Sequence, residues 1–196
     1  MTASGNKDGK TGRLIVVSGP SGAGKSTIIS RVLARRPDLA YAVSVTTRPR
    51  RGQERNGVDY HFVSEETFRE KIQTGELAEW ARVHGRYYGT CARFIETQRR
   101  NGTDVVVDVD TQGAQSLLSK YTDAMSIFVS PPTMEVLQER LVSRRTETPE
   151  AIEMRLANAR EEMKQMNRYT HVLVNDDVEH AVSEFLAVLN ETGIHG

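Results

Sequence analysis

The chain has 196 residues, of which 38% are hydrophobic and 27% charged, and its 26 Lys and Arg residues balance 26 Asp and Glu residues. This composition is typical of one soluble globular domain, without an apolar run long enough to span a membrane or a bulk charge that attracts nucleic acid. The single cysteine excludes an intramolecular disulfide and a cysteine-built metal site. Residues 1–12 are polar and lack the apolar stretch of a secretory signal, so we expect a flexible N-terminal segment and a cytoplasmic protein.

The first predicted elements are a buried strand, a Gly-rich turn and a helix. The β-branched run LIVVS follows Arg13, and the helix extends from Lys25 to about Arg35. Between them, Gly19–Ser26 reads GPSGAGKS and matches the phosphate-loop pattern G-x-x-x-x-G-K-[ST]. An accidental Gly-rich turn is the alternative, but the strand before it and the helix after it are the context that phosphate binding requires. We therefore expect a site for a Mg²⁺-nucleoside triphosphate, with Lys25 at the β and γ oxygens and the Ser26 hydroxyl on the metal.

Three further apolar runs predict strands: VVVDV at 105–109, MSIFVS at 125–130 and HVLVN at 171–175. Helical segments lie between them, so the sequence predicts an α/β fold with a parallel sheet flanked by helices. Residues 44–93 break this rhythm. They contain a strand-like DYHFVS, a helix from Glu65 to Thr74 stopped by Gly75, and a second strand-like stretch. We expect an inserted, mixed and partly antiparallel lobe there.

A second insertion begins with the basic segment ERLVSRRTETPE at 139–150. It leads into a predicted helix whose apolar positions have helical spacing and are expected to pack: Ile152, Leu156, Ala159, Met163 and Met166.

Acidic residues surround the strand at 105–109. Alternation places Asp104, Asp108 and Asp110 on one face of this strand. Acids at the C-terminal end of a parallel strand can reach a metal, a water or a substrate hydroxyl. Simple solvation of the strand end is the alternative, and it is the better reading of Asp104.

The first insertion carries a basic and phenolic cluster. Arg48, Arg50 and Arg51 lie within four positions, and Tyr60, Tyr87 and Tyr88 follow. Guanidinium groups and phenols suit a dianionic phosphate, so this cluster predicts a second phosphate site, with a solvated basic loop as the alternative.

At this point the residues resemble a known family. The motifs are S-x-x-T-R-x-x-R from Ser44, NGVDYHFVS from Asn56, EW at Glu79, YYGT from Tyr87, D-x-D-x-Q-G from Asp108 and VND from Val174. Together with the phosphate loop, these motifs resemble those of the guanylate kinases, which are P-loop nucleoside monophosphate kinases. The resemblance extends from about Leu14 to Leu189 and keeps the family's order of motifs. The resemblance implies Mg²⁺-dependent, direct in-line transfer of the γ-phosphoryl group of ATP to GMP, giving ADP and GDP.

The resemblance also implies roles for individual residues. The ATP-binding residues are Gly19, Pro20, Ser21, Gly22, Ala23, Gly24, Lys25, Ser26, Thr27 and, near the adenine, Asn175. The GMP-binding residues are Ser44, Arg48, Arg51, Tyr60, Glu79, Tyr88, Thr90 and Asp108. Arg48, Arg51, Tyr60 and Tyr88 hold the phosphate, and Ser44, Glu79 and Thr90 face the guanine. The catalytic residues are Lys25, Arg48 and the lid arginines Arg144 and Arg155, and Mg²⁺ is held by Ser26 and, through water, Asp110.

Guanine offers N1–H and N2–H₂ to one carboxylate, Glu79, and a hydroxyl such as that of Thr90 can donate to O6. The implied division is a flexible segment at 1–12, a core of 13–43, 94–138 and 168–196, a GMP-binding lobe at 44–93, and a lid with its following helix at 139–167. Arg145 and Thr111 depart from the family pattern. Two alternatives stay open, an inactive peptide-binding module and a kinase for another phosphorylated acceptor. The choice between monomer and homo-oligomer is also open.

Overall fold

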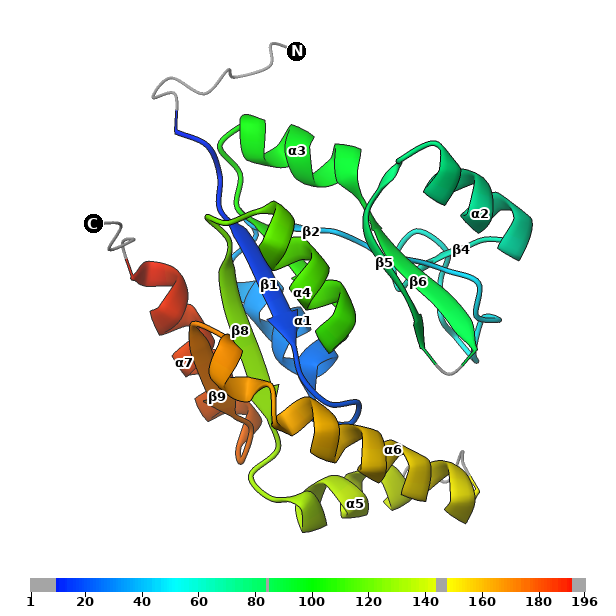
Figure 1. Ribbon diagram of the computed structural model, residues 1–196. Coiled ribbons are helices and arrows are strands. Elements are labelled where there is room, and N and C mark those ends of the chain that lie inside the picture. Colours follow the sequence, from blue (N-terminus) through cyan, green and yellow to red (C-terminus); the bar gives the residue numbers. More distant parts are fainter. Residues whose placement is uncertain (1–9, 84, 144–147, 192–196) are drawn as a thin grey trace. The chain divides into compact units, whose positions relative to one another are not determined.

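The computed structural model describes residues 10–83, 85–143 and 148–191. Within these residues a five-stranded sheet has the order β2-β7-β1-β8-β9, and a separate four-stranded sheet has the order β4-β3-β6-β5 (Figure 1). The strands of the first sheet are β1 Leu14–Ser18, β2 Ala40–Tyr41, β7 Val105–Asp108, β8 Met125–Ser130 and β9 His171–Val174. Those of the second are β3 Val45–Thr46, β4 His61–Phe62, β5 Leu77–Val83 and β6 Arg86–Cys91. The predicted α/β class with an inserted mixed lobe is confirmed.

The helices connect these strands in chain order. They are α1 Lys25–Arg35, α2 Glu65–Gln73, α3 Ala92–Arg100, α4 Thr111–Lys120, α5 Met134–Ser143, α6 Pro149–Met163 and α7 Val178–Asn190, with a short 3₁₀ turn at Met166–Arg168. Among the described residues, no helix has the length and apolar character needed to cross a membrane.

The chain forms two compact units. The first comprises the described residues up to Val16 together with Asp38–Met125, and the second comprises Val17–Pro37 together with the described residues from Ser126 onward. The four-stranded sheet lies in the first unit, and the phosphate loop lies in the second.

The four-stranded sheet is mixed because β3 pairs in parallel with β4, whereas β6 is antiparallel to both β3 and β5. Phe68 of α2 is fully buried against Val45 and Leu77, and its ring stacks on Tyr87 at 5.3 Å between centroids. Side chains alternate along a strand, so Tyr87 of β6 packs against α2, while Tyr88 and Thr90 lie on the opposite face of the sheet. Figure 1 shows α2 beside this sheet.

In the second unit, α1 packs against α7, and α7 packs against β9. Arg31 and Arg35 of α1 both form ion pairs with Glu179 of α7. Helices α5 and α6 form a pair through buried Leu137 and Leu156 (Figure 1). The predicted apolar stripe of α6 is confirmed for Ile152, Leu156 and Ala159, which pack against α5.

Several predicted boundaries differ from the structure. Helix α6 ends at Met163, so the prediction that Met166 continues this helix is wrong, and Met166 begins the 3₁₀ turn instead. Only His61–Phe62 of the expected strand DYHFVS is a strand. The preceding chain turns at Gly57, whose φ is 77°, and Ser64 caps α2 through the Thr67 N–H. A residue needed for a turn or a cap cannot also extend a strand ladder.

The expected common face of the three aspartates is also wrong, because only Asp108 belongs to β7. Asp104 precedes the strand and accepts hydrogen bonds from the backbone N–H and the guanidinium of Arg13, at 2.7 to 2.9 Å. Asp110 follows the strand and caps α4 by accepting from the Gly113 N–H at 2.7 Å. Asp104 therefore has a structural role, in line with the non-functional alternative for this residue.

Candidate active site

The phosphate loop depends on glycines that no other residue could replace without strain. Gly19, Gly22 and Gly24 have φ values of 132°, 96° and 97°. A Cβ atom on Gly19 would lie 2.1 Å from the Val129 carbonyl oxygen, and one on Gly24 would lie 2.2 Å from Asn175 Nδ2. The loop is thus held in a left-handed, tightly packed path in which backbone N–H groups can surround an anion.

The loop ends at the N-terminus of α1, which offers a site for negative charge. Gly24 occupies the N-cap position in the left-handed conformation, no side chain caps the helix, and its first turn carries no acidic residue. The first backbone N–H groups and the positive end of the helix dipole remain for a ligand. Lys25 Nζ donates to the Gly19 carbonyl at 2.6 Å, and Ser26 and Thr27 are exposed in the first turn.

Asn175 supports the loop from the end of β9. Its side chain is only 2% exposed, and Nδ2 donates to the Ala23 carbonyl at 2.6 Å. Arg140 of α5 in turn donates to the Asn175 carbonyl at 2.9 Å. Arg140 is not among the residues predicted from the sequence, although it lies four residues before Arg144 in the basic segment.

Arg155 is the lid arginine that the structure describes. It projects from α6, and Nη1 donates to Ser21 Oγ of the phosphate loop at 3.4 Å. Predicted residues Lys25, Asn175 and Arg155 are therefore brought together around one loop. Arg144 and its unusual neighbour Arg145 lie outside the described residues.

The predicted acceptor cluster is assembled in the first unit around Arg48. This residue is 8% exposed, and its guanidinium carbon lies 5.1 Å from the centroid of the Tyr60 ring. The Tyr60 and Tyr88 rings meet edge to face at 6.1 Å. Burial, together with the charge of Asp108, raises the pKa of Tyr60 to about 12, so its hydroxyl stays protonated and can donate. Arg48, Tyr60 and Tyr88 are thus neighbours, and the charge of Asp108 is close enough to act on Tyr60.

Glu54 is a member of this cluster that the sequence analysis missed. It accepts from Arg48 Nη1 at 3.0 Å and Nη2 at 2.7 Å, and also from the Arg51 N–H at 2.8 Å. The hydrogen bond from Arg48 lowers the pKa of Glu54. Only one acidic residue lies between Asp38 and Asp59, which is the signal that could have identified Glu54 as the partner of the arginines.

The bidentate pair fixes the guanidinium without using all of it. Arg48 Nη1 donates to Glu54 and to the Pro49 carbonyl, and Nη2 donates once to Glu54. An arginine has five N–H donors in a planar fork. Among the described residues, the Nε–H and the second Nη2–H of Arg48 have no protein acceptor, and this edge is suited to a phosphate.

A buried carboxylate faces the other side of the sheet from α2. Glu79 of β5 is 6% exposed and directly opposes Thr90 of β6 in the antiparallel register. The Thr90 hydroxyl donates to Glu79 Oε1 at 2.7 Å. The resemblance implies that this hydroxyl donates to guanine O6, whereas in the structure it donates to Glu79. The cross-strand pairing brings the two side chains together more closely than their sequence separation suggests.

Burial raises the pKa of Glu79 to about 7, and the nearby charge of Asp110 acts in the same direction. The hydrogen bond from Thr90 partly opposes this rise.

Ser44, which precedes β3, is also buried, whereas Arg51 is exposed. The first unit therefore combines a basic cluster suited to a phosphate with a buried carboxylate that can accept hydrogen bonds.

The raised pKa predicts a pH dependence. A carboxylate must be ionised to accept two N–H groups together, so acceptor binding weakens as the pH falls through the pKa of Glu79. With a pKa of about 7, kcat/KM for a guanine-bearing acceptor should fall about tenfold from pH 8 to pH 6. Steady-state kinetics over this range measure the effect. The Glu79→Gln variant should lose this part of the profile, and an unchanged profile in the variant would contradict the assignment.

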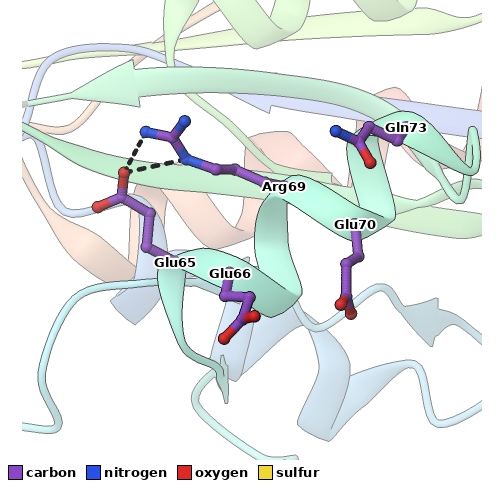
Figure 2. A pocket seen from close by; sticks show the side chains of 5 residues that line it. All are labelled: Glu65, Glu66, Arg69, Glu70 and Gln73. Atoms are coloured by element: carbon purple, nitrogen blue, oxygen red, sulfur yellow. Dashed lines mark hydrogen bonds and ion pairs between the residues drawn. The ribbon is translucent and has the colours of Figure 1, made fainter.

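Helix α2 carries a separate surface pocket, lined by Glu65, Glu66, Arg69, Glu70 and Gln73 (Figure 2). Arg69 pairs with Glu65 at 2.6 Å, so the other two carboxylates leave the pocket with an excess of negative charge. Its residues come from one exposed helix, and none of them belongs to the predicted site. The negative charge makes this pocket unsuited to a nucleotide phosphate.

One unit presents an anion site built from a strand, a glycine loop and a helix. The inserted lobe carries a second cluster of side chains suited to a phosphate. These two features define the class of P-loop kinases that act on phosphorylated acceptors of the nucleoside monophosphate type. Comparison with known proteins specifies the family. The family model for guanylate kinase matches residues 11–192, and the chain belongs to this family.

Individual relatives agree with the family model. The guanylate kinase of Symbiobacterium thermophilum is 47% identical over 178 residues, covering 91% of this chain and 84% of the relative. That of Thermotoga maritima is 43% identical over 178 residues, covering 91% and 86%. The crystal structure of guanylate kinase from Anaplasma phagocytophilum superimposes with a TM-score of 0.79 at 30% identity, covering 95% of this chain and 88% of the other.

Proposed function

We propose that the protein transfers the γ-phosphoryl group of ATP to GMP and releases ADP and GDP. The choice of GMP as the acceptor rests on the buried carboxylate of Glu79, which accepts a hydrogen bond from the Thr90 hydroxyl. The phosphate loop that would hold ATP is intact in this chain. Guanine presents N1–H and N2–H₂ side by side, and one carboxylate accepts both. Adenine presents an acceptor at N1, so it would leave the buried carboxylate unpaired.

ATP would bind through the phosphate loop, Gly19 to Thr27. Its backbone N–H groups and the α1 N-terminus would surround the phosphates, and Lys25 would exchange the Gly19 carbonyl for the β and γ oxygens. We place Asn175 near the adenine, where its side chain would keep the hydrogen bond that it donates to the Ala23 carbonyl.

The exposed Ser26 hydroxyl fits a Mg²⁺ that is held mainly by phosphate and water oxygens. The described residues contain no group of three His, Cys, Asp or Glu side chains that could hold a metal by themselves. Ser26 and, through water, Asp110 are our proposed contributors. When bound with ATP, Mg²⁺ would neutralise phosphate charge, and the chain's task would be to orient the phosphates in line with the acceptor.

GMP would bind in the first unit. The free edge of Arg48, with Arg51, Tyr60 and Tyr88, would hold its phosphate, and Ser44, Glu79 and Thr90 would face its base. Asp108, beside Tyr60, would contact the nucleotide next to this cluster. Thr90 would orient Glu79 instead of donating to O6.

Arg155 and Arg144 would supply positive charge to the transferring phosphoryl group and help to exclude water. In this proposal residues 139–167 form the lid and the helix that follows it, 44–93 form the GMP-binding lobe, and 13–43, 94–138 and 168–196 form the core. Arg155 already reaches Ser21, which supports its placement. We also propose a cytoplasmic protein that has no nucleic-acid or membrane partner, since both of its substrates are free nucleotides.

The test is a coupled assay of ADP formation from ATP and Mg²⁺, with GMP, dGMP, AMP, UMP and CMP offered separately. We expect GMP to give the fastest turnover and AMP to be rejected by a factor on the order of 10⁴. Equal turnover with AMP would indicate a kinase for another acceptor. No turnover with any acceptor, in a protein that still binds ATP, would favour the inactive peptide-binding alternative.

A further inference from the structure

Gly113, in the first turn of α4, lies against the carboxylate that reads the base. A Cβ atom built on Gly113 would lie 2.6 Å from Glu79 Oε2 and 3.2 Å from Asp110 Oδ1. The backbone of Gly113 has no positive φ, so its conformation does not require glycine. A side chain at residue 113 would instead compete with Glu79 for space, so the carboxylate would have to move.

Each of the two oxygens of Glu79 is thus constrained by a contact of its own. Oε1 accepts from the Thr90 hydroxyl at 2.7 Å, and Oε2 lies over the bare Cα of Gly113. Helix α4 packs against β5, so the helix cannot easily withdraw. The carboxylate can accept two adjacent N–H groups only when both of its oxygens point at them. The two contacts together fix the carboxylate in one such orientation.

We propose that Gly113 is a positioning residue for guanine specificity, because the absence of its side chain seats Glu79 against the first turn of α4. This inference rests on the proposed function, in which Glu79 accepts from guanine. A methyl group at residue 113 would displace Oε2 by about 1 Å, a misplacement that is enough to cost up to about 100-fold in a precise site.

The test is the Gly113→Ala variant. Its KM for GMP should rise about 10- to 100-fold, while KM for ATP stays within about twofold, because the phosphate loop is untouched. Alanine is a better helix former than glycine, so the melting temperature should not fall through any helix effect. The matched control is Ser116→Ala, an exposed substitution one turn later in α4 that should leave both KM values unchanged.

A second readout separates positioning from general damage. IMP keeps the N1–H of GMP but lacks the 2-amino group, so only GMP gains from the second hydrogen bond to Glu79. Gly113→Ala should therefore reduce the preference for GMP over IMP by about tenfold or more, whereas general damage to the lobe would weaken both nucleotides equally. An unchanged preference, or an unchanged KM for GMP, would overturn the inference.

The Glu79→Ala background makes the test independent of folding. There the methyl group of Ala at 113 meets no carboxylate, so adding Gly113→Ala should leave KM for GMP at the value of the single Glu79→Ala variant. If Gly113→Ala alone fails to fold and the double variant folds, the contact with Glu79 is confirmed as the constraint. An equal rise in KM in both backgrounds would overturn it. If Glu79→Ala itself leaves KM for GMP unchanged, the assignment of the base pocket fails as well.

Discussion

Replacing Lys25 with alanine should lower kcat on the order of 10³-fold. Lys25 is the first residue of α1, and its ammonium group is held at the Gly19 carbonyl at 2.6 Å, inside the loop that would surround the phosphates. A preorganised cation that meets developing charge in the transition state is worth far more than one in water, because it costs no reorganisation during the reaction. Removal of one such donor typically costs about 3 to 4 kcal/mol.

Single-turnover measurements with saturating ATP and GMP should show this loss in the chemical step. Lys164→Ala is the matched control, because Lys164 lies in the same unit, is 69% exposed and forms a surface ion pair with Glu161. The control should keep full turnover. If Lys25→Ala retained more than about a tenth of the original kcat, the phosphate loop would not be the donor site.

The Glu79→Gln variant should raise KM for GMP by about 100-fold or more, with KM for ATP nearly unchanged. Glutamine keeps the size of the side chain but replaces one acceptor oxygen with an NH₂ group that opposes a guanine N–H donor. A buried donor left without an acceptor costs about 1 to 3 kcal/mol, and loss of the charge adds to this. The variant also turns the Thr90 contact from a charge-assisted bond into a neutral one.

Initial rates over a matrix of ATP and GMP concentrations separate the two KM values. Glu70→Gln is the matched control, since Glu70 is an exposed carboxylate of α2 in the same unit (Figure 2). It should leave both values unchanged, which would also confirm that the α2 pocket takes no part in catalysis. Equal effects of Glu79→Gln on both substrates would remove Glu79 from the base pocket.

The local pattern of the chain is sufficient for much of the fold. The buried run Leu14–Ser18, the glycine loop and α1 follow from hydrophobic runs and from glycine, which alone tolerates the loop's backbone. Strand ends are less predictable. The stretch DYHFVS at 59–64 has a strand-like pattern, but the turn at Gly57 before it and the Ser64 cap at its end leave a strand of two residues.

The sequence alone also determined which chemistry the protein carries. Lys25 in its motif and the arginines of the inserted lobe are identifiable from residue type and spacing, because these side chains suit phosphates. The roles of Glu79 and Thr90 come instead from the resemblance to the guanylate kinases. The family comparison agrees with this reading.

Only the tertiary structure decided how these groups constrain one another. Antiparallel pairing directs the Thr90 hydroxyl to Glu79, the fold brings Glu54 onto Arg48, and helix packing sets Gly113 under the carboxylate. These relations depend on register and on small differences in distance between side chains far apart in the sequence. A local pattern specifies which element a residue occupies, but the packing of one element on another determines which of its hydrogen bonds remain for a substrate.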